Sequence, residues 1–327
     1  MLKLGVIGTG WISSSFVEAA LLTKQYDIDA VYSRTLAGAV SFTEDWDHVA
    51  VYNELGEFFQ HDLDVIYIAS PNSLHFEHAK LAIEAGHNVI VEKPAFSNPK
   101  ELAEIIALAE SKGKLFFEAA RNIHEDAYKK IKDFLADKEV IGADFTYSKY
   151  SSKMPALLEG KKLPNKFNKA FSGGLLADLG VYMLYGSVYW FGKPDSAYYN
   201  AVVLPSGVDL SGVGCLDYGN YKVAVKNAGN FNSYLPSEIY TTTGTLVLDA
   251  ISEIKSAKFI DLEGNEEKLV CKPAKHNLYD EAVDFAGILN DPAGQQAAYQ
   301  ELMDYALAVA ETSYKMRERA GIVYDAD

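Results

Sequence analysis

A short apolar strand that runs directly into a glycine turn is the feature that most limits the fold of this chain. Residues 2–7 are mostly apolar and are typical of a buried parallel strand. Gly8 permits a tight turn, Gly10 lets the backbone approach a pyrophosphate, and the next helix offers its first amides to that anion. Ser13 stands in place of the usual third glycine and is the next smallest residue for close packing of helix on strand. The pattern predicts a dinucleotide-binding turn, whose candidate contacts are Gly8, Thr9, Gly10, Trp11 and Ile12.

Strands and helices alternate through the first part of the chain. Apolar runs at 28–32, 65–69 and 88–91 are predicted strands, and Asn98 followed by Pro99 is typical of a helix start. This alternation predicts a doubly wound parallel sheet, whose ligand crevice lies outside the carboxyl ends of the strands. Other expected elements are strands at 49–52 and 115–119 and helices at 13–23 and 73–85.

The pattern changes after about residue 120, so we divide the chain into a dinucleotide-binding domain at 1–120 and a second domain at 121–327. Within 197–273 the chain reads as successive strands separated by Gly, Asn and Pro turns, which favours a mostly antiparallel sheet. The second domain is therefore predicted to be α+β. Its expected helices lie at 125–136, 174–191, 278–289 and 297–319.

Composition and charge exclude several classes of protein. The net charge of −15 argues against a nucleic-acid partner, which would favour a basic face. No apolar run approaches the roughly 18 residues of a membrane span, and the first strand leaves no room for a signal peptide. Cys215 and Cys271 could form one disulfide, but two cysteines in 327 residues favour free thiols and a cytoplasmic protein. No residue spacing is typical of a metal site.

The end of the second strand indicates the cofactor. NAD-binding folds usually carry an acidic residue there, which binds the ribose 2′-hydroxyl and would repel a 2′-phosphate. This chain has Ser33 and Arg34 instead, a hydroxyl donor and a guanidinium that suits phosphate. We therefore expect NADP(H) rather than NAD, although Arg34 could also be a surface residue beside an NAD site.

Three further segments contain polar residues where a site is expected. Two of them follow strands of the first domain, Ser70-Pro71-Asn72 with His75 and Glu92-Lys93-Pro94. The third is the glycine-rich start of the helix at 174–191, in the second domain. Asp178 and Tyr182 are four residues apart there, so one helix face is expected to present both.

Together these motifs resemble the glucose–fructose oxidoreductase / inositol dehydrogenase / rhizopine catabolism (Gfo/Idh/MocA) family over nearly the whole chain. The resemblance implies a Rossmann domain joined to a domain with a large open-faced sheet, whose open face commonly forms a homodimer or homotetramer interface. It also implies that Lys93 is catalytic, that the bond from Lys93 to Pro94 is cis, and that Asp178 belongs to the active site. The cofactor contacts that it adds are Ser70, Pro71, Asn72, His75, Glu92 and Lys93.

Tyr182 departs from many members of that family, which have histidine at this position as the acid/base. The chain is instead similar to the branch with tyrosine there, which includes glucose–fructose oxidoreductase, dihydrodiol dehydrogenase and NADP-linked xylose dehydrogenase. Members of this branch often use NADP(H), which agrees with the independent argument from Ser33 and Arg34. The expected function is hydride transfer between nicotinamide and a carbinol or carbonyl of a sugar, polyol or related small molecule.

Elementary chemistry supports these roles. A tyrosine is a poor base near neutral pH, but a nearby ammonium such as Lys93 favours its phenolate and eases proton exchange. Asp178 could hold that ammonium or bind a substrate hydroxyl, and in reduction Tyr182 would donate the proton. The alternatives are an NAD-dependent polyol dehydrogenase and a non-catalytic nucleotide-binding regulator. The lysine-rich segment 161–169 could draw in anionic substrates or could be a solvated loop.

Overall fold

The computed structural model describes residues 1–160 and 163–327. The chain forms two compact units, one of Met1–Arg121 with Lys275–Asp304 and one of Asn122–Ala274 with Tyr305–Asp327. The sequence division near residue 120 lies at the first of these boundaries. The position of Lys275–Asp304 differs from the sequence division. That division placed the segment in the second domain, whereas its contacts group it with the first unit.

The first unit is built on a six-stranded sheet in the order β3-β2-β1-β4-β5-β6, in which all neighbouring strands are parallel. This confirms the predicted doubly wound sheet. The strand order reverses between β1 and β4, which is where such sheets bind ligands. Its strands are β1 (Leu2–Ile7), β2 (Tyr26–Tyr32), β3 (Ala50–Tyr52), β4 (Val65–Ile68), β5 (Asn88–Glu92) and β6 (Phe116–Ala119).

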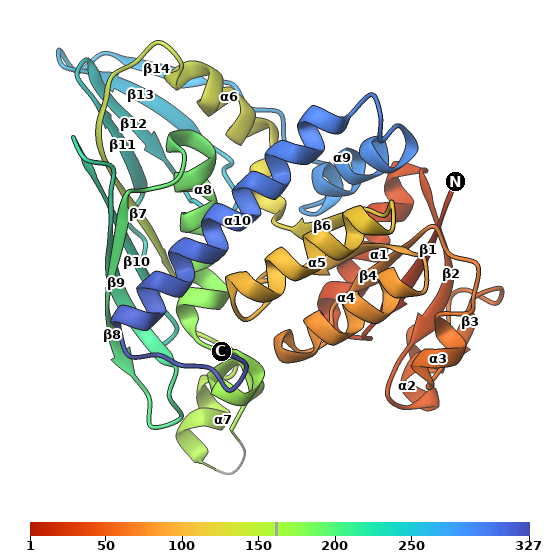
Figure 1. The fold of residues 1–327 in the computed structure, drawn as a ribbon. Coiled ribbons are helices and arrows are strands. Elements are labelled where there is room, and N and C mark those ends of the chain that lie inside the picture. Colours follow the sequence, from red (N-terminus) through yellow and green to blue (C-terminus); the bar gives the residue numbers. More distant parts are fainter. Residues whose placement is uncertain (161–162) are drawn as a thin grey trace. The chain divides into compact units, whose positions relative to one another are not determined.

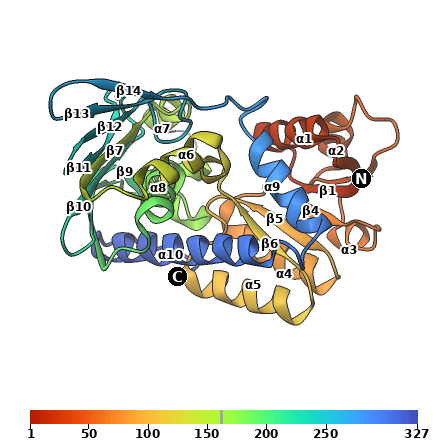
Figure 2. The ribbon, with the colours of Figure 1, turned by 90° about the horizontal axis from the view of Figure 1, so that it is seen from above.

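Helices cover both faces of this sheet: α1, α2 and α9 lie on one face and α4 and α5 on the other (Figure 2). Asn98 caps α5 as predicted, because its side chain accepts hydrogen bonds from the amides of Lys100 and Glu101. The short helices α2 and α3 were not predicted. The helices of this unit are α1 (Trp11–Thr23), α2 (Leu36–Phe42), α3 (Leu55–Phe58), η1 (Asn72–Leu74), α4 (His75–Glu84), α5 (Pro99–Ser111) and α9 (Tyr279–Asn290).

Helix α9 explains why a late segment of the chain belongs to the first unit. Its residues Ala282, Phe285 and Ala286 are fully buried, and the Phe285 ring lies 4.8 Å from that of Phe117 on β6. The Tyr26 hydroxyl on β2 donates a 2.9 Å hydrogen bond to the carbonyl of Ala282. Burial of this apolar face favours the return of the chain to the first sheet.

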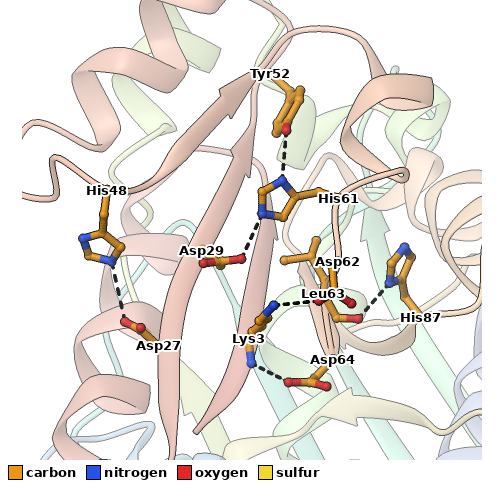
Figure 3. Close-up of polar contacts among 10 residues, drawn as sticks. All are labelled: Lys3, Asp27, Asp29, His48, Tyr52, His61, Asp62, Leu63, Asp64 and His87. Atoms are coloured by element: carbon orange, nitrogen blue, oxygen red, sulfur yellow. Dashed lines mark hydrogen bonds and ion pairs between the residues drawn. The ribbon is translucent and has the colours of Figure 1, made fainter.

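Polar side chains brace several strands of the first sheet (Figure 3). The backbone amide of Lys3 donates to the Asp64 carboxylate at 2.7 Å, next to the start of β4. The His61 ring lies between the Tyr52 hydroxyl and the Asp29 carboxylate, at 2.9 Å from each. The Lys3 contact lies at the amino edge of the sheet, whereas the glycine turn follows a carboxyl end.

The second unit is built on an eight-stranded sheet in the order β14-β13-β12-β11-β7-β10-β9-β8. Only the β7–β10 pair is parallel among the described pairs, so the predicted, mostly antiparallel sheet is confirmed. Its strands are β7 (Val140–Ser148), β8 (Ser196–Val203), β9 (Asp209–Asp217), β10 (Lys222–Ala228), β11 (Ser237–Thr241), β12 (Gly244–Leu248), β13 (Ala257–Asp261) and β14 (Glu266–Leu269).

Helices α6, α8 and the later part of α10 lie against one face of this sheet, and no described helix lies against the other (Figure 1). Fully buried Phe145 on β7 packs against Trp190 and Phe191 of α8. None of the described helices has the length and apolarity of a bilayer span. The remaining helices are η2 (Arg121–His124), α6 (Asp126–Leu135), α7 (Met154–Glu159), η3 (Asn165–Phe167), η4 (Lys169–Phe171), η5 (Leu176–Gly180), α8 (Val181–Phe191) and α10 (Gln296–Arg319).

Candidate active site

The turn after β1 needs glycine at its first position. Gly8 has a φ of +102°, and a Cβ there would lie 2.6 Å from the carbonyl oxygen of Ala69. This close approach arises because β1 and β4 are neighbours, and the Ala69 amide donates to the Ile7 carbonyl at 2.9 Å. Gly8 therefore brings the turn against the chain that leaves β4, at the switch point of the sheet.

The start of α1 fits a dinucleotide pyrophosphate. Gly10 is the N-cap without a side-chain hydrogen bond, and the first turn carries no acidic residue. A Cβ at Gly10 would meet no atom within 4 Å, so the approach to these amides is open. Ser13 is fully buried, as expected for close packing, and its hydroxyl has no hydrogen-bond partner among the described residues. Open helix amides without a competing carboxylate are suited to binding an anion.

The residues expected to contact the 2′-position of the cofactor ribose follow the end of β2. The Ser33 hydroxyl lies 3.5 Å from the Thr9 hydroxyl, so the β2 end and the glycine turn are adjacent. Arg34 is exposed, and Thr35 caps α2 by accepting from the Gly38 amide. Gly38 leaves room for this arrangement, because a Cβ there would lie 2.9 Å from the Ser33 hydroxyl. The donors at this strand end fit a 2′-phosphate.

His75 joins two of the predicted site loops. Its ring is buried, with Nε2 at 2.8 Å from the Ser70 carbonyl and Nδ1 at 3.1 Å from the Ala95 carbonyl. Burial lowers the pKa of His75 to about 4, so the ring is neutral at neutral pH. The ring thereby ties the loop after β4 to the chain after Lys93, whose bond to Pro94 is cis as expected. Contact of His75 with cofactor stays a prediction.

Glu92 is the last residue of β5 and Lys93 follows it, and their side chains differ in exposure. Glu92 is buried, and its carboxylate accepts a 2.5 Å hydrogen bond from the Tyr67 hydroxyl on β4. Burial raises the pKa of the Glu92 carboxyl, while neighbouring Lys93 opposes that rise. Lys93 itself is half-buried. Glu92 thus anchors the strand end from inside the sheet, and Lys93 is the residue of the pair that is open to solvent.

The predicted helix at 174–191 begins with a π-helical turn, η5, before it continues as α8. Asp178 lies in η5 and Tyr182 in α8, so the simple four-residue spacing along one α-helix does not describe them. Turns of this type are frequent at functional sites. The Asp178 carboxylate forms a 2.5 Å ion pair with Lys166, and both side chains are about one-third exposed, at 33% and 28%.

The lysine-rich segment is fastened to the glycines that precede this helix. The Gly174 amide donates to the Lys166 carbonyl at 2.7 Å, and the Gly173 amide donates to the Asn168 carbonyl at 3.2 Å. A Cβ at Gly173 would lie 2.4 Å from the Lys166 carbonyl oxygen. The paired glycines therefore let Lys166 reach Asp178. Lys161 and Lys162 of the segment lie outside the described residues.

Tyr182 is oriented by neighbours in its own unit. Its ring meets that of Tyr147 on β7 edge to face, with centroids 5.6 Å apart. The Asn122 side-chain amide donates to the Tyr182 carbonyl at 3.2 Å and to the Tyr128 hydroxyl at 2.9 Å. Asn122 is fully buried, and its Oδ1 has no hydrogen-bond partner among the described residues.

A family model described as "Oxidoreductase family, NAD-binding Rossmann fold" matches residues 2–120. The uncharacterized oxidoreductase YgjR of Escherichia coli is 34% identical over 100% of this chain and 99% of its own length. The scyllo-inositol 2-dehydrogenase (NADP(+)) IolU of Bacillus subtilis is 32% identical, also over 100% of this chain and 99% of its own. The chain belongs to the Gfo/Idh/MocA oxidoreductase family.

This Gfo/Idh/MocA oxidoreductase also has the fold of solved proteins. A crystal structure of KijD10, a 3-ketoreductase from Actinomadura kijaniata in complex with NADP and TDP-benzene, superposes with a TM-score of 0.83. The two chains are 19% identical, and the match covers 99% of each. The family resemblance and the fold expected from the motifs are therefore confirmed.

The structure of the oxidoreductase also adds residues that the motifs did not single out. Asn122 and Tyr147 contact Tyr182, and Lys166 pairs with Asp178. The lysine-rich segment was noticed in the sequence, but nothing in it distinguishes Lys166 from the other lysines. The roles of the predicted catalytic and cofactor residues stay predictions.

Proposed function

We propose that this protein is an NADP(H)-dependent oxidoreductase that transfers hydride between nicotinamide and a carbinol or carbonyl of a sugar, polyol or related small molecule. The observation that carries the proposal is the pair Ser33 and Arg34 at the end of β2, beside the glycine turn. No carboxylate follows β2 directly to repel a 2′-phosphate, and Arg34 offers a guanidinium. The names of IolU and of the KijD10 complex, which both include NADP, support this choice.

The proposed chemistry assigns one task to each predicted catalytic residue. When bound, the nicotinamide supplies the hydride or accepts it. Tyr182 takes the hydroxyl proton as a phenolate during oxidation, and as the phenol it donates that proton during reduction. Lys93 contributes an ammonium that stabilises the developing charge on the substrate oxygen. Asp178 accepts a hydrogen bond from a substrate hydroxyl, while its ion pair with Lys166 holds the carboxylate in place.

The contacts of Tyr182 support its assignment as the acid/base. Tyr147 restricts the ring from one side, and Asn122 fixes the backbone of the same residue. A proton donor held within about 0.5 Å of its productive position transfers protons much better than a mobile one. The half-buried position of Tyr182 leaves its ring accessible to a small molecule.

For the substrate we favour a cyclic or linear polyol. The support is the relative IolU, named a scyllo-inositol 2-dehydrogenase, which is 32% identical over the whole chain. A carboxylate and a phenol offer hydrogen-bond acceptors and a donor for neighbouring hydroxyl groups, which a polyol presents.

The deciding experiment is turnover over a panel of inositols, aldoses, keto sugars and dihydrodiols, with NADP⁺, NAD⁺ and both reduced forms in parallel. The matched variants are Tyr182→Phe and, as a control, Tyr234→Phe, because Tyr234 is 90% exposed. We expect turnover with NADP(H) that falls by about 100-fold or more in Tyr182→Phe and is unchanged in Tyr234→Phe.

Two other outcomes would overturn parts of the proposal. Turnover that prefers NAD(H) would indicate an NAD-dependent polyol dehydrogenase. Binding of NADPH without turnover over the whole panel, together with a protein partner that binds only the NADPH-loaded form, would indicate a regulator.

We also propose a homo-oligomer that associates through the free face of the eight-stranded sheet. The support is the exposure of apolar side chains on that face, which include Tyr198, Val202 and Val213 at 52%, 59% and 56%. Apolar surface of this kind is typical of subunit interfaces.

A cytoplasmic location is supported by Cys215 and Cys271, which are not bonded to each other.

A further inference from the structure

Asp209 is a buried carboxylate that the proposed chemistry does not use. It is the first residue of β9 and is fully buried. The partners of its carboxylate are the Tyr199 hydroxyl at 2.7 Å, the Asn227 side-chain amide at 3.3 Å and two backbone amides. None of these groups is a cation, and burial raises the pKa of the Asp209 carboxyl. A buried carboxylate without a cationic partner is costly, so its hydrogen bonds must stabilise it.

The two backbone amides belong to the start of the helix that carries Asp178 and Tyr182. Leu175 donates to one carboxylate oxygen of Asp209 at 3.0 Å, and Leu176 donates to the other at 2.7 Å. Neither η5 nor α8 has a side-chain cap from its own N-cap residue. Asp209 therefore acts as the cap from a distant strand, because its two carboxylate oxygens accept hydrogen bonds from the first amides of the helix.

Gly174 shows that the backbone is shaped around this carboxylate. Its φ is +116°, and a Cβ there would lie 2.3 Å from Oδ1 of Asp209. Gly174 also donates to the Lys166 carbonyl on its other side. The turn before the helix is thus held between the lysine-rich segment and the carboxylate.

Neighbouring strands hold the carboxylate in turn. Tyr199 lies on β8 and Asn227 on β10, the two strands that flank β9. The Asn227 amide also donates to the Tyr199 hydroxyl at 2.9 Å. Gly212 leaves the space for the Tyr199 ring, since a Cβ there would lie 2.2 Å from it. Residues of three neighbouring strands therefore hold the Asp209 carboxylate, which in turn holds the start of η5 and α8.

We propose that Asp209 is a positioning residue for the reaction: it holds the start of η5 and α8 on the sheet so that Asp178 and Tyr182 keep their productive orientation. This inference rests on the proposed function, because it concerns the same catalytic residues. Asp178 follows the capped amide of Leu176 by only two residues, so loss of the cap displaces it directly.

The test compares Asp209→Asn, Asp209→Ala and the matched control Thr241→Val in the intact protein. Thr241 is also buried in the same sheet, and its hydroxyl donates to the Gly244 carbonyl without touching the helix. We expect kcat to fall about 10- to 100-fold in Asp209→Ala and less in Asp209→Asn, which keeps one acceptor oxygen. The Kd for NADPH should stay within about twofold, and Thr241→Val should keep the kcat of the wild type.

Amide hydrogen exchange gives a second measurement that does not need turnover. We expect exchange in residues 174–182 to speed up at least about tenfold in Asp209→Asn and to stay unchanged in Thr241→Val. If Asp209→Ala does not fold, Asp209→Asn and Tyr199→Phe carry the comparison. A kcat within twofold of the wild type, an equal loss in Thr241→Val, or unchanged exchange would overturn the role of Asp209. Lack of any turnover in the wild type would instead overturn the proposed function, and exchange would still report whether Asp209 holds the helix.

Discussion

In our proposal, two residues at the end of β2 make the protein prefer NADP(H) over NAD(H). Ser33 lies against Thr9 of the glycine turn, and the next residue, Arg34, is exposed. A guanidinium can donate two parallel hydrogen bonds to a phosphate, whereas a ribose hydroxyl gains little from it. We therefore expect discrimination between NADP(H) and NAD(H) to depend mainly on Arg34.

Replacing Arg34 by alanine should weaken NADPH binding without affecting NADH. Loss of a charged hydrogen bond costs roughly 1.5–3 kcal/mol, which raises the Kd for NADPH by about 10- to 150-fold. Fluorescence titration with both cofactors measures the two constants. Lys112→Ala is the control, because Lys112 is an exposed cation in the same unit. An NADPH affinity within about twofold of the wild type would contradict the assignment.

His75 makes the stability of the first unit depend on pH. Burial lowers the pKa of His75 from about 6.5 to about 4. Between pH 4 and pH 6.5, His75 is therefore mostly protonated in the unfolded chain and mostly neutral in the folded chain. The free energy of unfolding therefore rises with pH across this window and falls as the pH is lowered from 6.5 to 4. The full shift corresponds to about 3 kcal/mol.

Urea unfolding of the intact protein at pH 7 and pH 5 measures this dependence. We expect His75→Asn to show a smaller pH difference than the wild type, because it removes the titrating ring. His48→Asn should keep the full difference, since the His48 side chain is 57% exposed. If the unfolding free energy changes by the same amount between pH 7 and pH 5 in the wild type and in His75→Asn, groups other than His75 cause the pH dependence.

At the scale of elements, the helix with Asp178 and Tyr182 depends on segments on both sides of its start. The lysine-rich segment approaches through the Lys166 carbonyl and side chain, and β9 approaches through Asp209. Gly173 and Gly174 occupy the turn between them, where side chains would meet these groups. The Gly-Gly motif of the sequence is thus a packing requirement of this turn.

Gly173→Ala should damage the site more than the fold. A Cβ at Gly173 would lie 2.4 Å from the backbone oxygen of Lys166, so the segment must move and the ion pair with Asp178 should be lost. We expect kcat to fall about tenfold or more and stability to fall by about 1–3 kcal/mol. Steady-state kinetics and thermal unfolding measure the two effects.

The matched control is Gly287→Ala in α9, where a Cβ would meet no atom within 4 Å. A glycine-to-alanine change inside a helix stabilises by up to about 1 kcal/mol, so this control should keep its activity and gain stability. If Gly173→Ala behaves like Gly287→Ala, the close approach of Lys166 does not matter for the reaction.

At the scale of the molecule, the free face of the eight-stranded sheet is the surface that an oligomer would cover. The pairing register places Tyr198 beside Cys215 and Asn200 beside Val213, so these side chains form rows across β8 and β9. Exposed apolar side chains on a broad sheet are costly in water and favour a second copy of the chain. We therefore expect a homo-oligomer in solution.

Val213→Arg should weaken this association, because it places a charge within the proposed interface. Light scattering at several concentrations should show a dimer or tetramer for the wild type and smaller species for the variant. Leu262→Arg is the control, since Leu262 is 79% exposed in the turn between β13 and β14. A monomeric wild type would contradict the expected interface.

Features within a few residues of one another could be predicted from the sequence. The turn at Gly8 and the cap at Asn98 depend on local backbone conformation and short hydrogen bonds, so their residues suffice to recognise them. The π-helical turn at Leu176–Gly180 was missed, because its register depends on how the helix start is held by the rest of the second unit.

The sequence by itself determined the alternation of strands and helices, the parallel first sheet, the mostly antiparallel second sheet and the family motifs, because hydrophobic periodicity and turn chemistry are local properties. Only the tertiary structure decided that α9 returns to the first unit, that Lys166 pairs with Asp178, and that Asp209 caps Leu175 and Leu176. These partners are set by the path of the chain through space, which brings together groups that no short-range pattern relates.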